Sequence, residues 1–481
     1  MGLVLGCVNI GVFACERDSQ CELDGRVGQC FDPGYCALPD EACESGYRFD
    51  DRSVPDDLAG RCAPMEDGSS TGTSTTGGSS SSSSGLGTST GGSSSEEGSS
   101  TTGHDCGDHP CGCTASLSVG TNHVCVARFD GEVICWGSNG YAELGMGRAS
   151  APIPWPQWVD IPGASGVLEV FDGNNHTCGL TQDESVYCWG RNASGEIDPA
   201  LVEDLVIAPT ALPLLEPPGA IGMGPQHTCV SSPVGPGVRC LGNNTNGKLG
   251  GPNPDPVDTM LPGMQAIEQM SLGRDHTCAM AGGQVWCWGR NNYGQLGDPM
   301  IMVSTPDPTE VVLPAPATMI AGGRDHTCVV LEGEVDEVLC WGRNNVGQIG
   351  DGTQALRNVP TALVEPLPSA VVGLSGRLDT SCALLEDGDL WCWGGLYGVE
   401  LGTAIEPEME LRVPMRVEVV DELPEPIVEA EVGASHLCAR AESGRLWCWG
   451  RDNLDQLGPI APPLGMTAVE IDVECPPGVG N

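Results

Sequence analysis

Short apolar runs alternate with turn residues along most of the chain after residue 115. In the clearest case, the runs 278–281 and 284–287 flank the dipeptide Gly282-Gly283. A two-residue glycine loop between apolar runs predicts a β-hairpin, because tight hairpin turns need positive φ at the loop residues. Apolar segments such as 266–272 and 167–171 precede the hairpins. Each of them predicts a further strand, which enters the same sheet ahead of the hairpin.

The hairpin belongs to a sequence unit that occurs seven times between Gly120 and Gly458. Each copy reads Gly-x-x-His-Thr-Cys or a close variant, then an apolar run, a turn and Cys-Trp-Gly. The first cysteine recurs at steps of 49 to 56 residues. This period fits one four-stranded propeller blade per copy. The sequence therefore predicts an all-β, seven-bladed β-propeller over residues 116–475.

Two cysteines in each copy are placed to form a disulfide. With a two-residue loop, Cys278 lies directly opposite Cys287, and opposed strand residues have Cα atoms about 4.5–5.5 Å apart, within disulfide range. Copies with the turns Asp130-Gly131 and Asp387-Gly388 need a slightly longer loop or a bulge. The expected pairs are Cys125 with Cys135, Cys178 with Cys188, Cys229 with Cys240, Cys278 with Cys287, Cys328 with Cys340, Cys382 with Cys392, and Cys438 with Cys448.

A tryptophan follows the second cysteine in six copies, and Leu241 takes its place in the third. Large apolar side chains at one register are expected to pack between neighbouring blades. The glycine that follows permits close backbone approach or positive φ. The tryptophans are Trp136, Trp189, Trp288, Trp341, Trp393 and Trp449.

Six of the eight histidines occupy one position of the repeat. A ring of histidines could suggest a metal or acid–base site, but one histidine per blade at the same strand position favours a structural role. We expect each of them to bond within its own blade. The sixth copy departs from the pattern, because Arg377-Leu-Asp379-Thr380-Ser381-Cys382 has no histidine and reads as one residue longer. The six are His123, His176, His227, His276, His326 and His436.

The repeat resembles that of the regulator-of-chromosome-condensation family. The resemblance rests on residues 273–278 (GRDHTC), 286–292 (WCWGRNN) and 294–297 (GQLG), and it covers about three quarters of the chain. It implies a seven-bladed propeller, whereas the motifs of kelch and WD propellers are absent. The cysteine pair in each repeat departs from intracellular members and is more similar to bacterial extracytoplasmic ones.

The region before the propeller divides by composition. Residues 1–14 are apolar and resemble a signal or lipoprotein-type segment, in which Cys7 is the candidate for lipidation and Cys15 a poorer one. Residues 15–64 form a six-cysteine module, whose 15 possible connectivities the sequence cannot separate. Residues 65–103, nearly all Ser, Gly and Thr, predict a flexible linker.

Residues 104–115 hold a lead-in rich in cysteine and histidine, with His104, Cys106, His109, Cys111 and Cys113. Metal binding is conceivable there, but paired thiols are favoured in an oxidised chain. Cys475 has no partner inside the repeats. Because a propeller brings its termini together, its expected partner is Cys106, Cys111 or Cys113. Such a bond would clasp the ring shut.

The net charge of −44, with Lys248 as the single lysine, limits the partners. Nucleic-acid binding requires a basic surface, and we expect none. Strong negative charge favours solubility and repels anionic membranes. We expect no cofactor and no metal, a monomer, and membrane attachment only through an N-terminal lipid.

No catalytic motif is present, so the chain is predicted not to be an enzyme. The favoured function is a non-catalytic propeller, on a bacterial cell envelope surface or secreted, that binds a macromolecule, most simply a protein. Trp155 and Trp158, among prolines, are candidate contacts, although they could instead cover a blade edge. The alternatives are a guanine-nucleotide-exchange or chromatin-type regulator, a secreted enzyme inhibitor, and a carbohydrate-active enzyme.

Overall fold

The computed structural model describes most of the region predicted to be a propeller. The described residues are 114–214, 216–251, 257–263, 265–301, 303–333, 336–395, 411–458 and 465–473, together with the backbone of short strands between 22 and 49. The chain divides into two compact units, Met1–Gly98 and Ser99–Asn481. The prediction for Cys7, the six-cysteine wiring, the metal alternative at 104–113 and the bond of Cys475 fall outside the described side chains.

The first unit contains two small antiparallel sheets. β1 (Glu22–Leu23) pairs with β2 (Arg26–Val27), and β4 (Tyr35–Pro39) lies between β3 (Gln29–Phe31) and β5 (Tyr47–Phe49).

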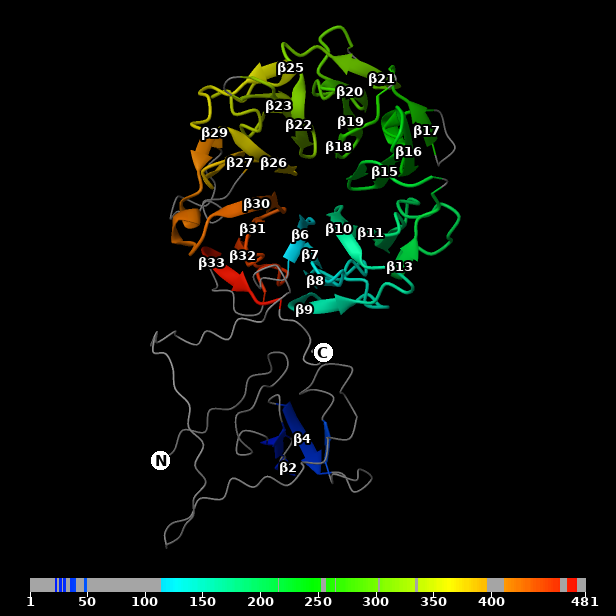
Figure 1. The fold of residues 1–481 in the computed structure, drawn as a ribbon, viewed down its shortest axis with the longest axis vertical. Helices are drawn as coiled ribbons and strands as arrows, with labels where there is room; N and C mark the ends of the chain where they lie inside the picture. The colour runs from blue at the N-terminus through cyan, green and yellow to red at the C-terminus, as the bar shows by residue number, and fades with distance from the viewer. Residues whose placement is uncertain are drawn as a thin grey trace, which may run out of the picture. The chain divides into compact units, whose positions relative to one another are not determined.

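The second unit contains seven four-stranded antiparallel sheets, each built from four consecutive strands, arranged in a ring with the first strand of each sheet nearest the axis (Figure 1). The predicted seven-bladed, all-β propeller is therefore confirmed.

The strands follow the chain order within every blade. Blades 1 to 4 are β6 (Thr114–Val119), β7 (His123–Arg128), β8 (Val133–Gly137), β9 (Ile153–Val159); β10 (Val167–Asp172), β11 (His176–Thr181), β12 (Val186–Arg191), β13 (Leu205–Ala211); β14 (Ile221–Met223), β15 (His227–Ser231), β16 (Gly237–Gly242), β17 (Val257–Met260); and β18 (Gln269–Leu272), β19 (His276–Ala281), β20 (Gln284–Gly289), β21 (Thr305–Val311). Blades 5 to 7 are β22 (Ala317–Gly322), β23 (His326–Leu331), β24 (Glu337–Gly342), β25 (Arg357–Ala362); β26 (Val371–Arg377), β27 (Thr380–Leu385), β28 (Leu390–Gly394), β29 (Leu411–Arg416); and β30 (Ile427–Val432), β31 (His436–Ala441), β32 (Leu446–Gly450), β33 (Gly465–Ile471). Two 3₁₀ turns, η2 (Thr245–Gly247) and η3 (Glu418–Glu422), lie in the connections.

Every blade contains one disulfide that joins its second and third strands. The cysteines are register partners, as the hairpin spacing predicts, and their Cα atoms lie 4.1–4.2 Å apart. The wider spacing at the Asp130-Gly131 turn is absorbed by a longer loop, in which the Arg128 amide bonds the Glu132 carbonyl at 2.9 Å. The bulges lie instead mainly at the flanks of the hairpin, for example between Cys287 and Gly289 against the fourth strand.

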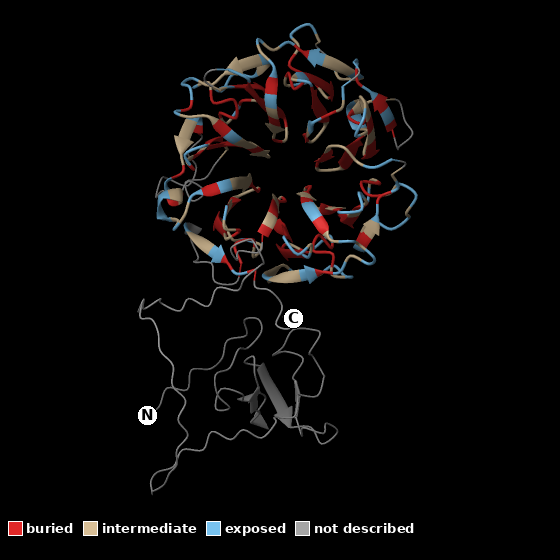
Figure 2. Cartoon of the chain, viewed as in Figure 1, coloured by how far each residue is buried: buried red, intermediate tan, exposed pale blue. Residues whose placement is uncertain are grey.

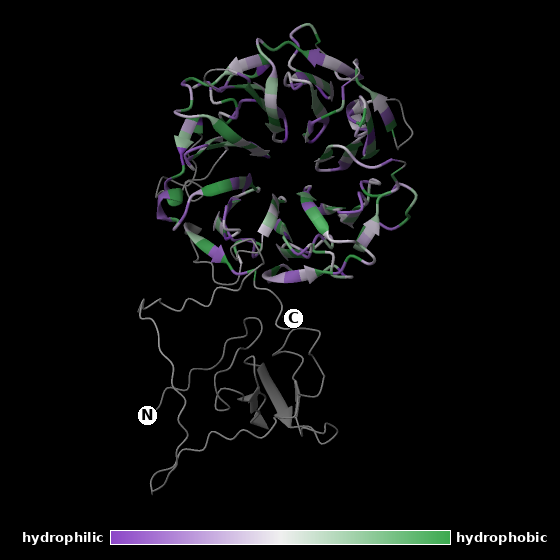
Figure 3. Cartoon of the chain, in the orientation of Figure 1, coloured by the Kyte–Doolittle hydropathy of each residue, from purple (hydrophilic) through white to green (hydrophobic). Residues whose placement is uncertain are grey.

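The core lies between blades rather than within one sheet. Each repeat tryptophan is buried, and it packs on the disulfide of the preceding blade, as Trp288 does on Cys229 and Cys240. Trp136 packs in the same way on Cys438 and Cys448 and so continues the core across the junction of blades 7 and 1. The expected packing between blades is confirmed. The second and third strands are mostly buried and the outermost strands are mixed (Figure 2), while many rim loops are hydrophilic (Figure 3).

The ring closes without an exchanged strand in the part that the structure describes, because blades 1 and 7 each use four consecutive strands. Trp136 Nε1 donates to the Gln456 carbonyl at 3.0 Å, and Arg128 Nη1 donates to the Val473 carbonyl at 3.3 Å. The Ala434 amide also bonds the Thr121 carbonyl at 3.0 Å. Among the described residues, none of the helical segments has the length and apolar character needed to cross a membrane.

Candidate functional site

One end of the propeller is built from the most regular parts of the repeat. The turn between the first and second strands of a blade ends at the repeat histidine, and this histidine pairs with the glycine of Cys-Trp-Gly on the third strand. The turn therefore lies beside the residue that follows Cys-Trp-Gly. In all seven blades the latter residue donates its amide to a carbonyl of the turn, as Arg290 does to Asp275 at 2.8 Å. The glycine has positive φ, for example 101° at Gly289, and an added Cβ there would lie 2.5 Å from the Asp275 oxygen. Only glycine fits this position.

The repeat histidines connect blades around the ring. His276 Nε2 lies 3.1 Å from Thr327 Oγ1 of blade 5, and His326 Nε2 lies 2.8 Å from Ser381 Oγ of blade 6. His123, His176 and His227 likewise contact the threonine of the next blade at 2.9–3.0 Å. The structural role therefore agrees with the sequence, but the expectation that each histidine bonds its own blade is wrong. Adjacent sheets share no backbone ladder, so these side-chain bonds add to the single backbone bonds between neighbouring blades, such as that from Arg274 to Arg324 at 2.8 Å.

The histidine explains the glycine three residues before it. A Cβ at Gly273 would lie 2.1 Å from the ring of His276, so the imidazole occupies the space of a side chain. In blade 6 the register places Thr380 at the histidine position and Arg377 at the glycine position. Arg377 and Thr380 have the same spacing as the glycine and histidine of the other blades. The expectation of one extra residue in blade 6 is therefore wrong. Without an imidazole above it, this position accommodates an arginine.

Two junctions lack the histidine bond for a reason visible in the sequence. His436 faces blade 1, where Val124 replaces the threonine. Among the described residues neither ring nitrogen of His436 has a hydrogen-bond partner. Blade 6 has Thr380 for histidine, and blade 7 has Leu437 at the position of the threonine that accepts the histidine in other blades.

A second set of links uses the tryptophans. The indole Nε1 of Trp288 donates to the Lys248 carbonyl at 2.9 Å, and that of Trp189 donates to the Glu143 carbonyl at 2.7 Å. Trp341 and Trp393 make the same bond to Gln295 and Gln348, both at 2.9 Å. Leu241 fills the position in blade 3 without a donor. The tryptophan thus combines apolar packing with an oriented hydrogen bond between blades.

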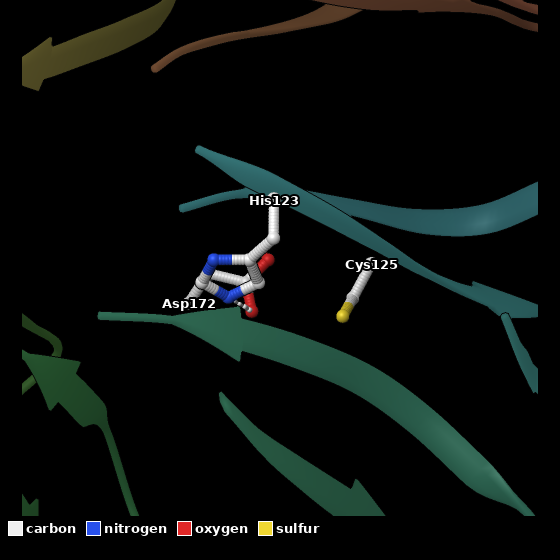
Figure 4. Close-up of side chains that lie close together, drawn as sticks. All are labelled: His123, Cys125 and Asp172. Carbon is white, nitrogen blue, oxygen red and sulfur yellow. Dashed lines mark hydrogen bonds and ion pairs between the residues drawn. The ribbon is translucent and has the colours of Figure 1, made fainter. Parts of the chain in front are cut away.

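His123, Asp172 and Thr177 form the one arrangement that resembles a catalytic triad among the described residues. His123 Nε2 lies 3.1 Å from Asp172 Oδ1 and 3.0 Å from Thr177 Oγ1, and Thr177 donates to Asp172 at 2.7 Å. Figure 4 shows the histidine and aspartate pointing at each other from β7 and β10, with the Cys125 sulfur beside them. All are buried, and Cys125 is bonded to Cys135. Substrate cannot reach these groups, and a thiolate ligand for a metal is absent.

Burial lowers the pKa of five repeat histidines, namely His176, His227, His276, His326 and His436. The pKa of His176 and of His436 falls to about 3, and that of His276 and of His326 to about 4, with loss of hydration as the main cause in each. The pKa of His227 also lies well below its usual value, first through burial and then through Lys248. The folded protein therefore holds these five imidazoles in the neutral form.

We expect acid to destabilise the propeller through these histidines. An unfolded histidine binds a proton near pH 6.5, so the stability is complete above that pH and is lost as pH falls toward the folded value of about 4. At pH 5 each such histidine costs roughly 2 kcal/mol. The His276→Gln variant should be less stable than the parent at pH 7 but lose less stability between pH 7 and pH 5. Urea unfolding at both pH values measures this difference, and equal losses in the two proteins would contradict it.

The end that carries the turns also gathers cations in blades 4 and 5. We call the surface formed by Arg274, Arg290, Tyr293, Arg324 and Arg343 the arginine face. The side chains of the four arginines are 20–36% exposed. The Tyr293 ring lies between Arg290 and Arg343, with the guanidinium carbons 5.4 and 5.3 Å from the ring centroid.

Aspartates hold this face in place across the blades. Arg274 pairs with Asp325 at 3.3 Å, and Arg324 pairs with Asp379 of blade 6 at 2.6 Å. Asp275 contacts Arg290 at 3.1 Å and the buried Lys248 ammonium at 3.4 Å. The result is one ion-pair network over four blades, in which rigid guanidinium groups retain partial access to solvent.

Trp155 and Trp158, the predicted contacts, lie on β9, the outermost strand of blade 1, and are 50% and 41% exposed. The Arg128 guanidinium covers the Trp158 ring at 4.9 Å. They are therefore apart from the arginine face, which the sequence interpretation missed. Its signals were present: Gly-Arg-Asp-His occurs at 273–276 and at 323–326, and Trp-Gly-Arg occurs at 288–290 and 341–343. The sequence alone does not show that these four segments lie next to one another in the folded protein.

These features define a class of protein: a closed, disulfide-containing β-propeller with a polar, partly exposed turn face. Its marks are the seven blades, the core between them and the repeated turn in which a histidine packs on a glycine. Residues 74–424 match the RCC1-like domain, and residues 427–456 match the regulator of chromosome condensation (RCC1) repeat. The chain therefore belongs to the RCC1-like propeller family.

Relatives in this family are distant. The chain is 28% identical to the ultraviolet-B receptor UVR8 of Arabidopsis thaliana over 71% of this chain and 78% of that protein. It is 25% identical to the mitochondrial RCC1 domain-containing protein RUG3 of the same plant over 68% of this chain and 65%, less than two thirds, of that protein. The crystal structure of Prp20p from Saccharomyces cerevisiae has the same fold, with a TM-score of 0.61, 20% identity, and coverage of 72% of this chain and 87% of that one.

Proposed function

We propose that this protein is a non-catalytic interaction module of the cell surface or secreted space, and that the arginine face is where it binds a protein partner. The observation that carries the proposal is Tyr293 held between Arg290 and Arg343 on a rigid, partly exposed surface. Tyrosine and arginine are enriched among residues that dominate binding energy. A preorganised surface also loses little conformational freedom when it binds.

Charge favours an acidic protein as the partner. The chain carries −44 overall, so a cluster of four arginines gives a local attraction for acidic groups. Complementary charge accelerates encounter and selects partners. Nucleic acid is disfavoured, because the net charge repels it and because Asp275, Asp325 and Asp379 already neutralise part of the cluster.

The disulfides support an oxidising compartment, because paired cysteines at this density persist outside the reducing cytosol. The proposal includes a bacterial envelope location and attachment through a lipid on Cys7. A non-catalytic role agrees with the burial of the His123–Asp172–Thr177 group. A guanine-nucleotide-exchange or chromatin role, suggested by the family, is less favoured because of the charge and the disulfides.

A binding experiment tests the proposal directly. The oxidised full chain, used as bait, should capture one envelope or secreted protein in stoichiometric amount. Tyr293→Ala should weaken that affinity at least about tenfold, because hot-spot truncations exceed about 1.4 kcal/mol. Arg239→Gln is the control, since Arg239 is paired with Asp258 in blade 3 and lies outside the arginine face. Affinities from surface plasmon resonance give the comparison.

Two outcomes would refute this assignment. A partner whose affinity is unchanged by Tyr293→Ala but reduced by Trp155→Ala would move the site to β9. Turnover of a glycan by the purified chain, lost on substitution of surface acids, would replace the binding role with an enzymatic one.

A further inference from the structure

Blade 6 places an arginine in the central channel. Arg377 occupies the position at which the other six blades carry the glycine beneath a histidine. Its Nη2 donates to the carbonyl of Val119 in blade 1, and to that of Asp172 in blade 2 at 2.9 Å. The side chain therefore extends from β26 past blade 7 to the opposite side of the axis. Among the described residues both hydrogen bonds of Arg377 come from Nη2, which leaves Nε and Nη1 as donors.

A cavity of about 180 Å³ lies beside this arginine. Its walls include the turn residues Asn174, Gly273 and Arg324, so it opens where the arginine face meets the axis. Met270, Ile320 and Leu374 supply an apolar lining. The cavity thus combines the guanidinium groups of Arg324 and Arg377 and the carboxyl groups of Asp172 and Glu431 with an apolar part of its wall.

We propose that this cavity binds a carboxylate carried on a short apolar chain, presented by the acidic partner and held by Arg377 and Arg324. This inference rests on the proposed function and names the group that the partner would insert. Arginine suits this task because its planar donors match the two oxygens of a carboxylate. The volume fits one amino-acid side chain or chain end, with its apolar stem against the methionine and leucine side chains.

Two acidic side chains, Asp172 and Glu431, lie in the wall, and Glu431 makes the proposal sensitive to pH. Glu431 on β30 lies in the cavity lining and accepts a hydrogen bond from Ser375 at 2.7 Å. Burial raises the pKa of Glu431 to about 7; Glu429 and Asp172 add to the rise, whereas the Ser375 hydrogen bond and Arg377 oppose it. Below pH 7 the neutral acid leaves the arginines to attract an anion. Above pH 7 its charge repels one.

The test uses the oxidised full chain and small probes in calorimetric titration. N-acetyl-leucine presents a terminal carboxylate, N-acetyl-glutamate with an amidated α-carboxyl presents a side-chain carboxylate, and N-acetyl-leucine amide lacks the charge. At least one carboxylate should bind about tenfold tighter than the amide, and about tenfold tighter at pH 6 than at pH 8. The tighter of the two identifies a chain end or an acidic side chain as the natural group.

Variants separate binding from folding. Arg377→Met should abolish carboxylate binding and Arg377→Lys should retain part of it, while Glu431→Gln should bind equally at pH 6 and pH 8. Arg445→Met, which removes a cation paired with Glu425 and Glu470 away from the channel, is the matched control. If Arg377→Met loses its near-UV circular dichroism, Arg324→Met provides the same comparison with the cross-channel bonds intact.

If both carboxylate probes bind no tighter than N-acetyl-leucine amide, or if binding is unaffected by both arginine variants, the inference is overturned. Neither result bears on capture of a partner by the arginine face, so failure of the cavity and failure of the proposed function are distinguishable.

Discussion

Reduction of all seven hairpin disulfides is expected to unfold the propeller at room temperature. Each bond closes a loop of 9 to 12 residues, for which chain entropy gives about 2–3 kcal/mol. A domain of this kind has about 5–15 kcal/mol of net stability. Even with imperfect additivity, the loss of seven such contributions exceeds that margin. The sulfurs are also packed against the next blade, so their loss removes part of the core.

The measurement must separate slow reduction from resistance to unfolding. The cysteines of the repeats are 0–1% exposed, so reductant alone acts slowly on the native chain. The protein should be reduced in guanidinium, alkylated and transferred to buffer, and its tryptophan fluorescence compared with that of an oxidised sample treated identically. Recovery of a native spectrum by the alkylated chain would show that inter-blade packing suffices without the bonds.

The second large effect is expected from Trp288→Ala, at about 3–5 kcal/mol. Trp288 is fully buried, packs on the Cys229–Cys240 disulfide and donates to the Lys248 carbonyl at 2.9 Å. The truncation leaves a cavity between two blades and removes one of the two hydrogen bonds that the Lys248 carbonyl accepts, the other coming from the Thr277 hydroxyl at 2.8 Å. Trp288→Leu should lose less, because Leu241 fills the same position in blade 3.

Trp155→Ala is the matched control, since Trp155 is 50% exposed on the outermost strand. Its free energy of unfolding should change by less than about 0.5 kcal/mol. Guanidinium unfolding of the three variants gives the values. A loss of under 1 kcal/mol for Trp288→Ala would mean that blades 3 and 4 reclose over the gap, and that the indole is not a main support of the junction.

The parts of the structure that sequence predicted well are local or repeated. The Gly282-Gly283 turn set the register that places Cys278 opposite Cys287. Seven copies of one unit implied seven blades, because a unit that cannot bury its apolar face alone must stack on its neighbours. The tryptophans were also placed correctly, between blades.

The errors occurred where a contact joins blades. His276 was assigned to its own blade, but its partner is Thr327, 51 residues away. Blade 6 was given an extra residue, because the loss of both glycine and histidine hides the alignment until strand pairing fixes Thr380 opposite Gly394. The sequence analysis chose the exposed tryptophans on β9 as candidate contacts and did not name the arginines of Gly-Arg-Asp-His.

By itself the sequence determined the propeller, its blade number, the seven disulfides and the inter-blade tryptophans, because these follow from periodicity and from turns a few residues long. Only the tertiary structure decided which blade each histidine contacts, how Arg290 and Arg343 come to enclose Tyr293, and that Arg377 crosses the axis to a carbonyl 205 residues away. Closing the ring fixes those contacts. No local pattern encodes them, since each depends on the angle between blades and on residues brought together from separate repeats.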